Sequence, residues 1–245
     1  MTKIFTDFDG TITLKDVGDT MFETFGGGEC KDIIREYQEG KISAVECFRR
    51  ESAACSHVKI DELNAFLDQQ EIDETFIDFV SYCRRRQFEC TILSDGMEYY
   101  IERILARHGV RDVPFFANTL HLIPVDGTSY VRFEPHFPYT DEMCDRCACC
   151  KRNHLLTLSG DDDSIIYIGE GYSDRCPARF ADMIFAKDEL LKYCQQENIS
   201  YYEYRTFADI IQRLECLLSK RSPEGNINIR RKRAERARRD VFIGE

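Results

Sequence analysis

Two carboxylates lie two residues apart near the start of the chain, at the end of a short run typical of a β-strand. Asp7 and Asp9 belong to the segment 7–11, which reads Asp-Phe-Asp-Gly-Thr and follows residues 3–6. On an extended strand such side chains point the same way, so both could share one pocket. Two close carboxylates need a cation or a shared proton, and Mg²⁺ couples carboxylates to phosphate oxygens. The pair alone is weak evidence, because turn caps and surface acids explain most such pairs.

Two further segments repeat this arrangement of a strand-like run followed by a polar turn with glycine. Residues 88–93 run into the turn 94–96, and residues 164–168 run into the acidic turn 169–174. After the second run, the apolar residues of 97–108 follow helical spacing, so a helix follows the strand. Alternating strands and helices predict a parallel α/β sheet, whose ligands bind at the carboxyl ends of the strands.

In chain order, the segment 7–11, Ser94, Lys151 and the turn 169–174 resemble the four motifs of the haloacid dehalogenase superfamily. The similarity extends from residue 4 to about residue 186. It implies a Rossmann-like α/β core, with a parallel sheet flanked by helices, and the activity of a Mg²⁺-dependent phosphatase.

The resemblance also implies a role for each site residue. Asp7 would attack phosphorus and form an aspartyl-phosphate, while Asp9 would protonate the leaving oxygen and later deprotonate water. Phosphate would be bound by Ser94, Asp95, Gly96 and Lys151, and Mg²⁺ by Asp7, Asp9, Glu170 and Asp174. Glu170 departs from the family pattern, in which aspartate is usual, and the longer side chain alters the reach of the carboxylate toward a metal.

The long connection between the first two motifs predicts a separate module. Residues 15–85 show amphipathic helical patterns and little β signal, and a simple crossover needs far fewer residues. We therefore expect a small helical cap of the type inserted after the first strand, able to act as a lid. The expected domains are a core of 1–14 and 86–220, the cap of 15–85, and a basic tail of 221–245.

The position of the cap is similar to that in the phosphoserine-phosphatase-like branch. Segments 7–13, 144–151 and 185–191 are similar to the 2-hydroxy-3-keto-5-methylthiopentenyl-1-phosphate phosphatases of methionine salvage. The resemblance implies a small phosphorylated metabolite as substrate, whose polar end would be contacted by Asp16 and Arg50. Arg49 is an alternative to Arg50 for this role. Each of the charged side chains could equally lie on the surface of a helix.

Four of the twelve cysteines, Cys144, Cys147, Cys149 and Cys150, cluster just before Lys151. Three interpretations stay open: a metal site, a redox pair, and small buried thiols that pack the loop presenting Lys151. The spacing is tighter than that of two zinc knuckles. A stable disulfide is disfavoured in a reducing compartment. Packing is the interpretation we favour.

The net charge of −11 is unevenly distributed. Residues 229–245 hold seven Lys or Arg and three acids, a net +4, which leaves −15 for residues 1–228. An acidic body repels nucleic acid at long range. The tail could contact a polyanion, although a solvated or self-docked tail is the more ordinary interpretation. No apolar run approaches the roughly 20 residues that span a bilayer, so we expect a cytoplasmic protein without a membrane partner.

Several alternatives stay open. Phosphoserine phosphatase activity belongs to the same branch, and a phosphotransferase would use the same aspartyl-phosphate with another hydroxyl as acceptor. A binding protein that kept the fold and lost turnover is the competing class. A second copy of the chain is also open as a partner, as in a homodimer.

Overall fold

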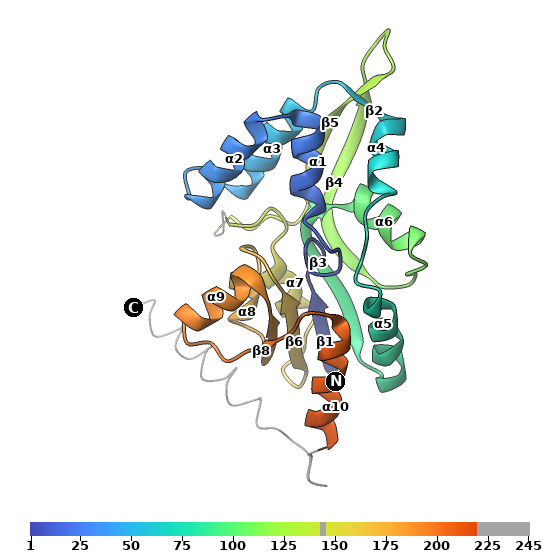
Figure 1. The fold of residues 1–245 in the computed structure, drawn as a ribbon. Coiled ribbons are helices and arrows are strands. Elements are labelled where there is room, and N and C mark those ends of the chain that lie inside the picture. Colours follow the sequence, from blue (N-terminus) through green and yellow to red (C-terminus); the bar gives the residue numbers. More distant parts are fainter. Residues whose placement is uncertain (143–145, 220–245) are drawn as a thin grey trace. The chain divides into compact units, whose positions relative to one another are not determined.

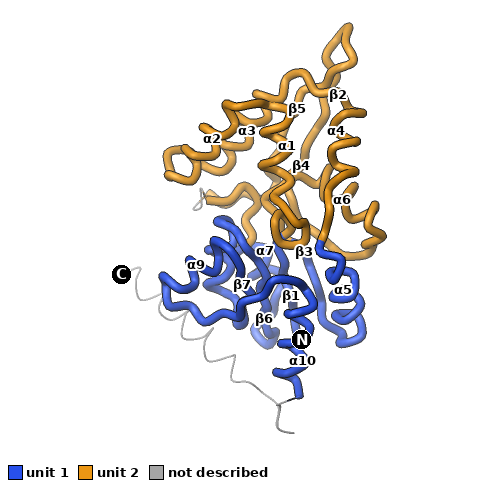
Figure 2. Tube along the Cα trace, viewed as in Figure 1, with its two compact units in different colours: residues 1–7, 73–92, 152–245 blue, residues 8–72, 93–151 orange. Residues whose placement is uncertain are grey.

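The computed structural model describes residues 1–142 and 146–219 and contains two compact units (Figure 2). Unit 1 comprises residues 1–7, 73–92 and 152–245, and unit 2 comprises residues 8–72 and 93–151. Each unit is described by itself below. The basic tail of 221–245, together with Cys144, lies outside the described residues.

Unit 1 contains the parallel sheet expected from the sequence. Its strands are β1 (Thr2–Thr6), the first part of β3 (Glu89–Met97), β6 (Ser164–Gly169), β7 (Met183–Ala186) and β8 (Tyr202–Glu203). The parallel pairs run in the order β3, β1, β6, β7, β8. Thr6 lies opposite Ile92 on one side and Ile168 on the other, so β1, β3 and β6 are in register at the level of Thr6.

Helices cover this sheet. They are α5 (Thr75–Arg86), α7 (Lys151–Thr157), α8 (Arg175–Ala178), α9 (Asp188–Gln196) and α10 (Phe207–Ser219) (Figure 1). The start of α10 is tied to the segment before α5, because Asp73 Oδ2 accepts the amide of Phe207 at 2.7 Å. The rings of Phe76 and Phe207 pack with centroids 4.8 Å apart. Both rings are fully buried.

Unit 2 contains an antiparallel hairpin, as the β-rich segment 115–139 predicts. Its strands are β4 (Phe115–Pro124) and β5 (Tyr130–His136), with Thr119 opposite His136. Gly127 adopts a φ of +71° in the connecting turn, a value that glycine tolerates best. The two-residue strand β2 (Val58–Lys59) pairs antiparallel with β5.

The insert that follows β1 is helical, as expected. The helices of unit 2 are α1 (Val17–Gly26), α2 (Glu29–Gln38), α3 (Ala44–Ala54), α4 (Ile60–Leu67) and α6 (Glu98–Arg107). Asp16 caps the first turn of α1 and Ser43 caps that of α3, each accepting a hydrogen bond from the amide three residues on.

One strand differs from the expectation. The second polar turn does not end its strand, because β3 continues through residues 94–96 to Met97. Asn118 of β4 donates its side-chain amide to the Asp95 carbonyl at 2.6 Å, which holds the chain in extended form there. The proposed core and cap boundaries stay a prediction. Among the described residues, no helix is long and apolar enough to cross a membrane.

Candidate functional site

Asp9 is the centre of a network of hydrogen bonds in unit 2. Its Oδ2 accepts the hydroxyl of Tyr100 at 2.7 Å and that of Ser94 at 3.3 Å, while Oδ1 accepts the amide of Val17 at 3.1 Å. Burial raises the pKa of Asp9 well above its usual range, and the negative charge of Asp16 adds to the rise. The Tyr100 hydrogen bond opposes it. A carboxyl group in this setting can hold a proton near neutral pH and donate it.

Ser94 and Gly96 lie on the end of β3 beside this carboxyl group. The Gly96 amide donates to Ser94 Oγ at 2.9 Å. A Cβ at Gly96 would lie 1.7 Å from the Tyr100 hydroxyl oxygen and 2.7 Å from Asp9 Oδ2. Both distances are far below van der Waals contact, so this position must be glycine while Tyr100 reaches Asp9.

Asp95 makes a contact that the sequence did not reveal. Its Oδ1 accepts the amide of Cys149 at 2.9 Å, two residues before Lys151. The Cys150 amide donates to the carbonyl of Tyr139 at 2.7 Å. Two consecutive amides of the loop that leads into α7 are therefore held, one by Asp95 and the other by Tyr139. Cys147, Cys149 and Cys150 are buried there, as the packing interpretation requires, although the interpretation stays a prediction.

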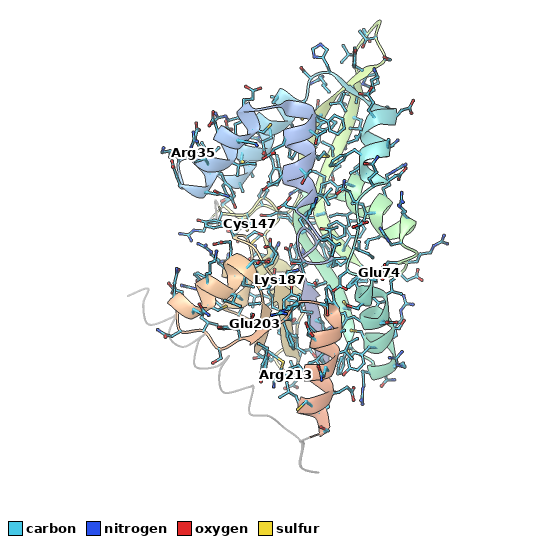
Figure 3. All side chains as sticks on the ribbon, viewed as in Figure 1. Arg35, Glu74, Cys147, Lys187, Glu203 and Arg213 are labelled. Atoms are coloured by element: carbon cyan, nitrogen blue, oxygen red, sulfur yellow. The ribbon has the colours of Figure 1, made fainter. Side chains whose placement is uncertain are left out.

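Lys151 is fully buried at the start of α7. Its positive charge acts on Asp16, so the two side chains are close within unit 2. Lys187 in unit 1 is placed differently. Figure 3 labels Lys187 on unit 1. Its Nζ lies 5.3 Å from the ring centroid of Tyr204 and interacts with that aromatic face. Lys151 therefore stays our candidate for the phosphate-binding lysine.

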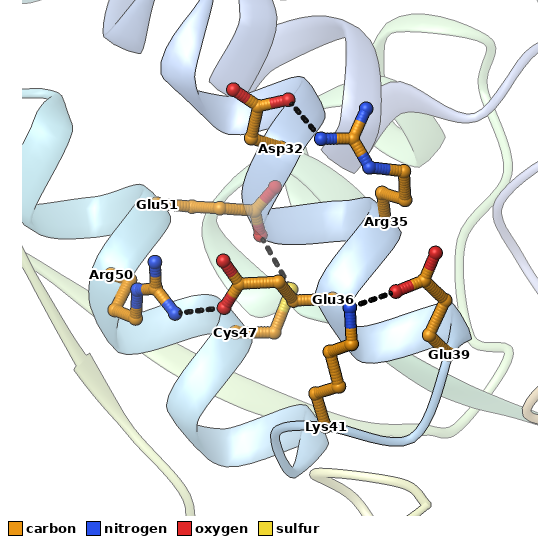
Figure 4. Close-up of polar contacts among 8 residues, drawn as sticks. All are labelled: Asp32, Arg35, Glu36, Glu39, Lys41, Cys47, Arg50 and Glu51. Atoms are coloured by element: carbon orange, nitrogen blue, oxygen red, sulfur yellow. Dashed lines mark hydrogen bonds and ion pairs between the residues drawn. The ribbon is translucent and has the colours of Figure 1, made fainter.

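The two candidate substrate contacts of the insert differ in their surroundings. Asp16 is exposed and caps α1 through its contact with the Asp19 amide at 2.8 Å. Arg50 donates from Nη1 to Glu36 Oε2 at 2.6 Å, and 39% of its side chain is exposed (Figure 4). This ion pair between α2 and α3 engages one nitrogen of the Arg50 guanidinium. Its role in substrate binding stays a prediction.

In unit 1, Asp7 follows β1 and lies at the edge where β6 also ends. Its amide donates to the Ile168 carbonyl at 2.9 Å, and the residue is 5% exposed. The acidic turn that begins with Glu170 follows β6 directly. Parallel strands bring their carboxyl ends to one edge. Asp7 and Glu170 therefore lie at the same edge of this sheet.

Asp174 organises the acidic turn. Its Oδ2 accepts the amides of Glu170 and Gly171, each at 2.9 Å, and its Oδ1 accepts the Tyr167 hydroxyl at 2.5 Å. A Cβ on Gly169 would come within 2.5 Å of the same carboxylate. The turn is thus wound around a fully buried Asp174.

The donor chemistry in the described residues fits a hard cation. Asp7, Asp9, Glu170 and Asp174 offer carboxylate oxygens, which are the ligands that Mg²⁺ prefers. The described parts of the chain contain no ready-made cluster of three or more His, Cys, Asp or Glu that could hold a metal. The four carboxylates thus match Mg²⁺ in the type of ligand atom that they offer.

Sequence reasoning missed two residues that shape this site. Tyr100 counted only as part of the apolar stripe of a helix, and Asn118 lay in a segment described only as β-rich. A tyrosine in an apolar stripe is a weak signal, because its hydroxyl needs a partner when buried. Only the fold identifies that partner as Asp9.

A parallel sheet in unit 1, a helical insert after β1 and the ordered carboxylates together define a haloacid dehalogenase-like phosphatase of the phosphoserine-phosphatase-like structural branch. The chain belongs to the family described as Putative Phosphatase, whose model matches residues 2–199. It is therefore an enzyme, a phosphatase of small phosphate esters.

Similar proteins come from fungi and bacteria. Pdp3-interacting factor 1 of Schizosaccharomyces pombe is 31% identical, over 87% of this chain and 95% of that protein. Polyol phosphate phosphatase PYP1 of Saccharomyces cerevisiae is 25% identical, over 88% and 93%. The 2-hydroxy-3-keto-5-methylthiopentenyl-1-phosphate phosphatase of Lysinibacillus sphaericus is 28% identical, over 88% and 94%.

The fold is similar to that of solved phosphoserine phosphatases. A structure of a phospho-aspartyl intermediate analogue of phosphoserine phosphatase superposes with a TM-score of 0.66 at 20% identity, and covers 86% of this chain and 98% of that chain. This similarity concerns the fold alone.

Proposed function

We propose that the protein is a Mg²⁺-dependent phosphomonoesterase that works through an aspartyl-phosphate on Asp7. The observation that carries the proposal is the Asp9 carboxyl, two residues after Asp7, which accepts hydrogen bonds from Tyr100 and Ser94 and whose pKa is raised by burial to about 8. A general acid must have a raised pKa and a fixed direction, and Asp9 has both.

The reaction has two displacements. A carboxylate oxygen of Asp7 attacks phosphorus, the bond from phosphorus to the ester oxygen breaks, and Asp9 gives its proton to the leaving alkoxide. Asp9, now a carboxylate, takes a proton from water. The hydroxide attacks phosphorus, the bond to Asp7 breaks, and orthophosphate leaves.

Charge compensation falls to residues that the structure holds rigidly. On substrate binding, the Ser94 hydroxyl would turn its one proton from Asp9 to a phosphoryl oxygen, and Lys151 would offset the negative charge of the phosphate. Asp95 would act through the loop before Lys151, since it binds the Cys149 amide. Fixed donors of this kind supply most of the catalysis in phosphoryl transfer.

Asp7 and Glu170 would hold Mg²⁺ through their carboxylates, with Asp174 holding the turn that carries Glu170 and offering its remaining lone pairs. Asp9 would contact the ion only in its deprotonated form. When bound, the ion would neutralise charge on the phosphate and on Asp7. The buried Asp174, with its amide and hydroxyl donors, keeps the backbone of Glu170 in one place. Glu170 reaches further than the aspartate usual in the family.

For the substrate, we propose a small phosphate ester whose organic part carries no strong negative charge. The names of the relatives supply two such candidates, polyol phosphates and 2-hydroxy-3-keto-5-methylthiopentenyl 1-phosphate of methionine salvage. Phosphoserine is the contrasting case, because it carries a carboxylate. A phosphotransferase would share the first displacement and differ only in the acceptor.

The test is phosphate release, with and without Mg²⁺, from an aryl phosphate, glycerol phosphate, phosphoserine and the salvage intermediate. We expect Mg²⁺-dependent release from at least one ester and no turnover by Asp7→Asn. Retained turnover in Asp7→Asn would remove Asp7 as the nucleophile. A polyhydroxylated acceptor that becomes phosphorylated faster than phosphate appears would show a phosphotransferase instead.

A further inference from the structure

A buried tyrosine of the central sheet contacts the acidic turn of unit 1. Tyr167 is the fourth residue of β6 and is fully buried, and both of its neighbours in the strand are isoleucines. Phenylalanine would fill the same space without a polar atom, whereas a buried tyrosine hydroxyl needs a hydrogen-bond partner. The hydroxyl of Tyr167 therefore does something that packing alone does not require.

The partner of this hydroxyl is the carboxyl group that organises the turn. Tyr167 donates to Asp174 Oδ1 at 2.5 Å, while Asp174 Oδ2 accepts the amides of Glu170 and Gly171, each at 2.9 Å. An O–H···O distance of about 2.5–2.7 Å is typical of a hydrogen bond to a carboxylate, which is stronger than one between neutral groups. One oxygen of Asp174 is thus bound to the strand and the other to the turn.

The backbone of Glu170 is held at both of its polar groups. Its amide donates to Asp174, and its carbonyl accepts the amide of Leu190 at 2.7 Å. Leu190 is the third residue of α9 and is fully buried. The backbone of Glu170 is therefore fixed relative to both β6 and α9, and only its side chain is left to move.

A fixed backbone matters more for a glutamate ligand than for an aspartate ligand. Glutamate has one more rotatable bond, so binding an ion must immobilise one more torsion. Mg²⁺ demands near-ideal octahedral geometry, with ligands at about 2.0–2.1 Å. The anchored turn therefore offsets part of the freedom that the longer side chain of Glu170 brings to this position.

The hydroxyl of Tyr167 can be removed without disturbing the rest of this arrangement. In Tyr167→Phe the ring stays in the core, and the two amide hydrogen bonds to Asp174 Oδ2 remain. What is lost is the bond that sets the direction of the Asp174 carboxyl from the side of the strand. The Glu170 backbone then takes up a wider range of positions.

We propose that Tyr167 is a positioning residue for the metal: its hydroxyl orients Asp174, which holds the backbone of Glu170 so that the Glu170 carboxylate meets Mg²⁺. This inference rests on the proposed function. It makes the affinity for the ion depend on a tyrosine inside the sheet that acts through two other residues.

The test measures metal binding directly, without a substrate. Mn²⁺ is the probe, because it takes the same oxygen ligands as Mg²⁺ and its electron paramagnetic resonance signal weakens when the ion binds. Titrations of the full chain give the Kd and the number of ions bound. A loss of folded protein lowers the number of ions, whereas a misplaced ligand raises the Kd and leaves the number unchanged.

The matched control is Tyr201→Phe. The Tyr201 hydroxyl accepts a hydrogen bond from Gln195 at 2.9 Å, in the same unit but away from the acidic turn. We expect Tyr167→Phe to raise the Kd for Mn²⁺ about five- to tenfold, the effect of one hydrogen bond. Tyr201→Phe should bind Mn²⁺ as the wild type does.

A second pair of variants tests whether Tyr167 acts through Glu170. Glu170→Gln removes the charged ligand and keeps the backbone contacts. If Tyr167 only positions this carboxylate, adding Tyr167→Phe to Glu170→Gln should change the Kd by less than about twofold. The kcat of Tyr167→Phe at saturating MgCl₂ should stay within about twofold of the wild-type value.

Two results would overturn the assignment: a Kd in Tyr167→Phe equal to that of the wild type, or an equal rise in the presence and absence of the Glu170 carboxylate. A wild type that binds no Mn²⁺ would overturn it together with the proposed metal site. A wild type that binds Mn²⁺ with the expected coupling but releases no phosphate from any ester would count against the proposed function alone.

Discussion

The hydroxyl of Tyr100 donates a hydrogen bond to Oδ2 of Asp9 across 2.7 Å. Both side chains belong to unit 2, and the tyrosine is 1% exposed. The contact fixes the direction of the Asp9 carboxyl, because Val17 holds the other oxygen. An acid held at both oxygens has one orientation from which to deliver its proton.

Removing that hydroxyl should slow catalysis. In Tyr100→Phe, Asp9 loses a hydrogen bond worth about 1–1.5 kcal/mol, so we expect kcat to fall about tenfold. The matched control is Tyr99→Phe. Tyr99 is the neighbour of Tyr100 on α6, and its hydroxyl donates a hydrogen bond to Asn64 of α4. Steady-state rates on an aryl phosphate measure both. Equal rates in the two variants would mean that Tyr100 does not orient Asp9.

Gly96 should not tolerate a methyl group. In Gly96→Ala the Cβ would collide with the Tyr100 hydroxyl and with Asp9 Oδ2, and displacing these groups by about 1 Å should cost on the order of 100-fold in kcat/KM. Gly28→Ala is the control, because a Cβ there meets nothing within 4 Å. Circular dichroism would confirm that both variants fold. Normal kcat/KM in Gly96→Ala contradicts this packing argument.

The length and charge of Glu170 should set the Mg²⁺ requirement. Glu170→Gln keeps the shape and removes a negative charge, so the Mg²⁺ concentration for half-maximal activity should rise at least about tenfold. Glu203→Gln removes an exposed carboxylate on β8 and serves as the control. Activity is measured against MgCl₂ concentration. An unchanged midpoint in Glu170→Gln would exclude Glu170 as a metal ligand.

Glu51 should make stability depend on pH. Burial raises its pKa from 4.5 to about 8 in the folded chain, the hydrogen bond from Cys47 opposes the rise, and the negative charge of Asp16 adds to it. Between these values the folded state keeps a proton that the unfolded state releases. The free energy of unfolding therefore falls as pH rises through this window, by up to about 1.4 kcal/mol per pH unit.

The measurement is urea unfolding of the wild type and Glu51→Gln between pH 5 and pH 8. The variant lacks the titrating group, so its unfolding free energy should fall less with rising pH than that of the wild type. Glu46→Gln should follow the wild type. Parallel profiles for all three proteins would show that Glu51 is ionised in both states.

Much of the fold follows from local patterns. The spacing of residues 97–108 predicts α6, the β-rich segment 115–139 predicts the β4 and β5 hairpin, and the stripe of 207–218 predicts α10. These elements are set by periodicity within a single segment. The predicted end of the second strand at residue 93 was wrong, because β3 continues to Met97. The contact at Asp95 comes from Asn118, more than 20 residues away, and no local pattern reveals it.

The site divides in the same way. Asp7, Asp9 and Ser94 could be selected from the sequence because a short motif carries them. Arg50 and Glu51 could not be told apart, since adjacent residues on a helix differ by about 100° and a shift of one position exchanges the exposed and buried faces. Packing of α3 within its unit decides which of the two faces inward.

Asp95 binds the amide of Cys149, so the strand that carries Ser94 also anchors the approach to Lys151. Ser94 and Lys151, the two groups that would bind the phosphate, are therefore both attached to the end of β3. Thermal motion that displaces the end of β3 carries both along, and the distance between them varies less than the position of either. Residues inserted before Cys149 could therefore lengthen the loop without changing the positions of Ser94 and Lys151 relative to each other.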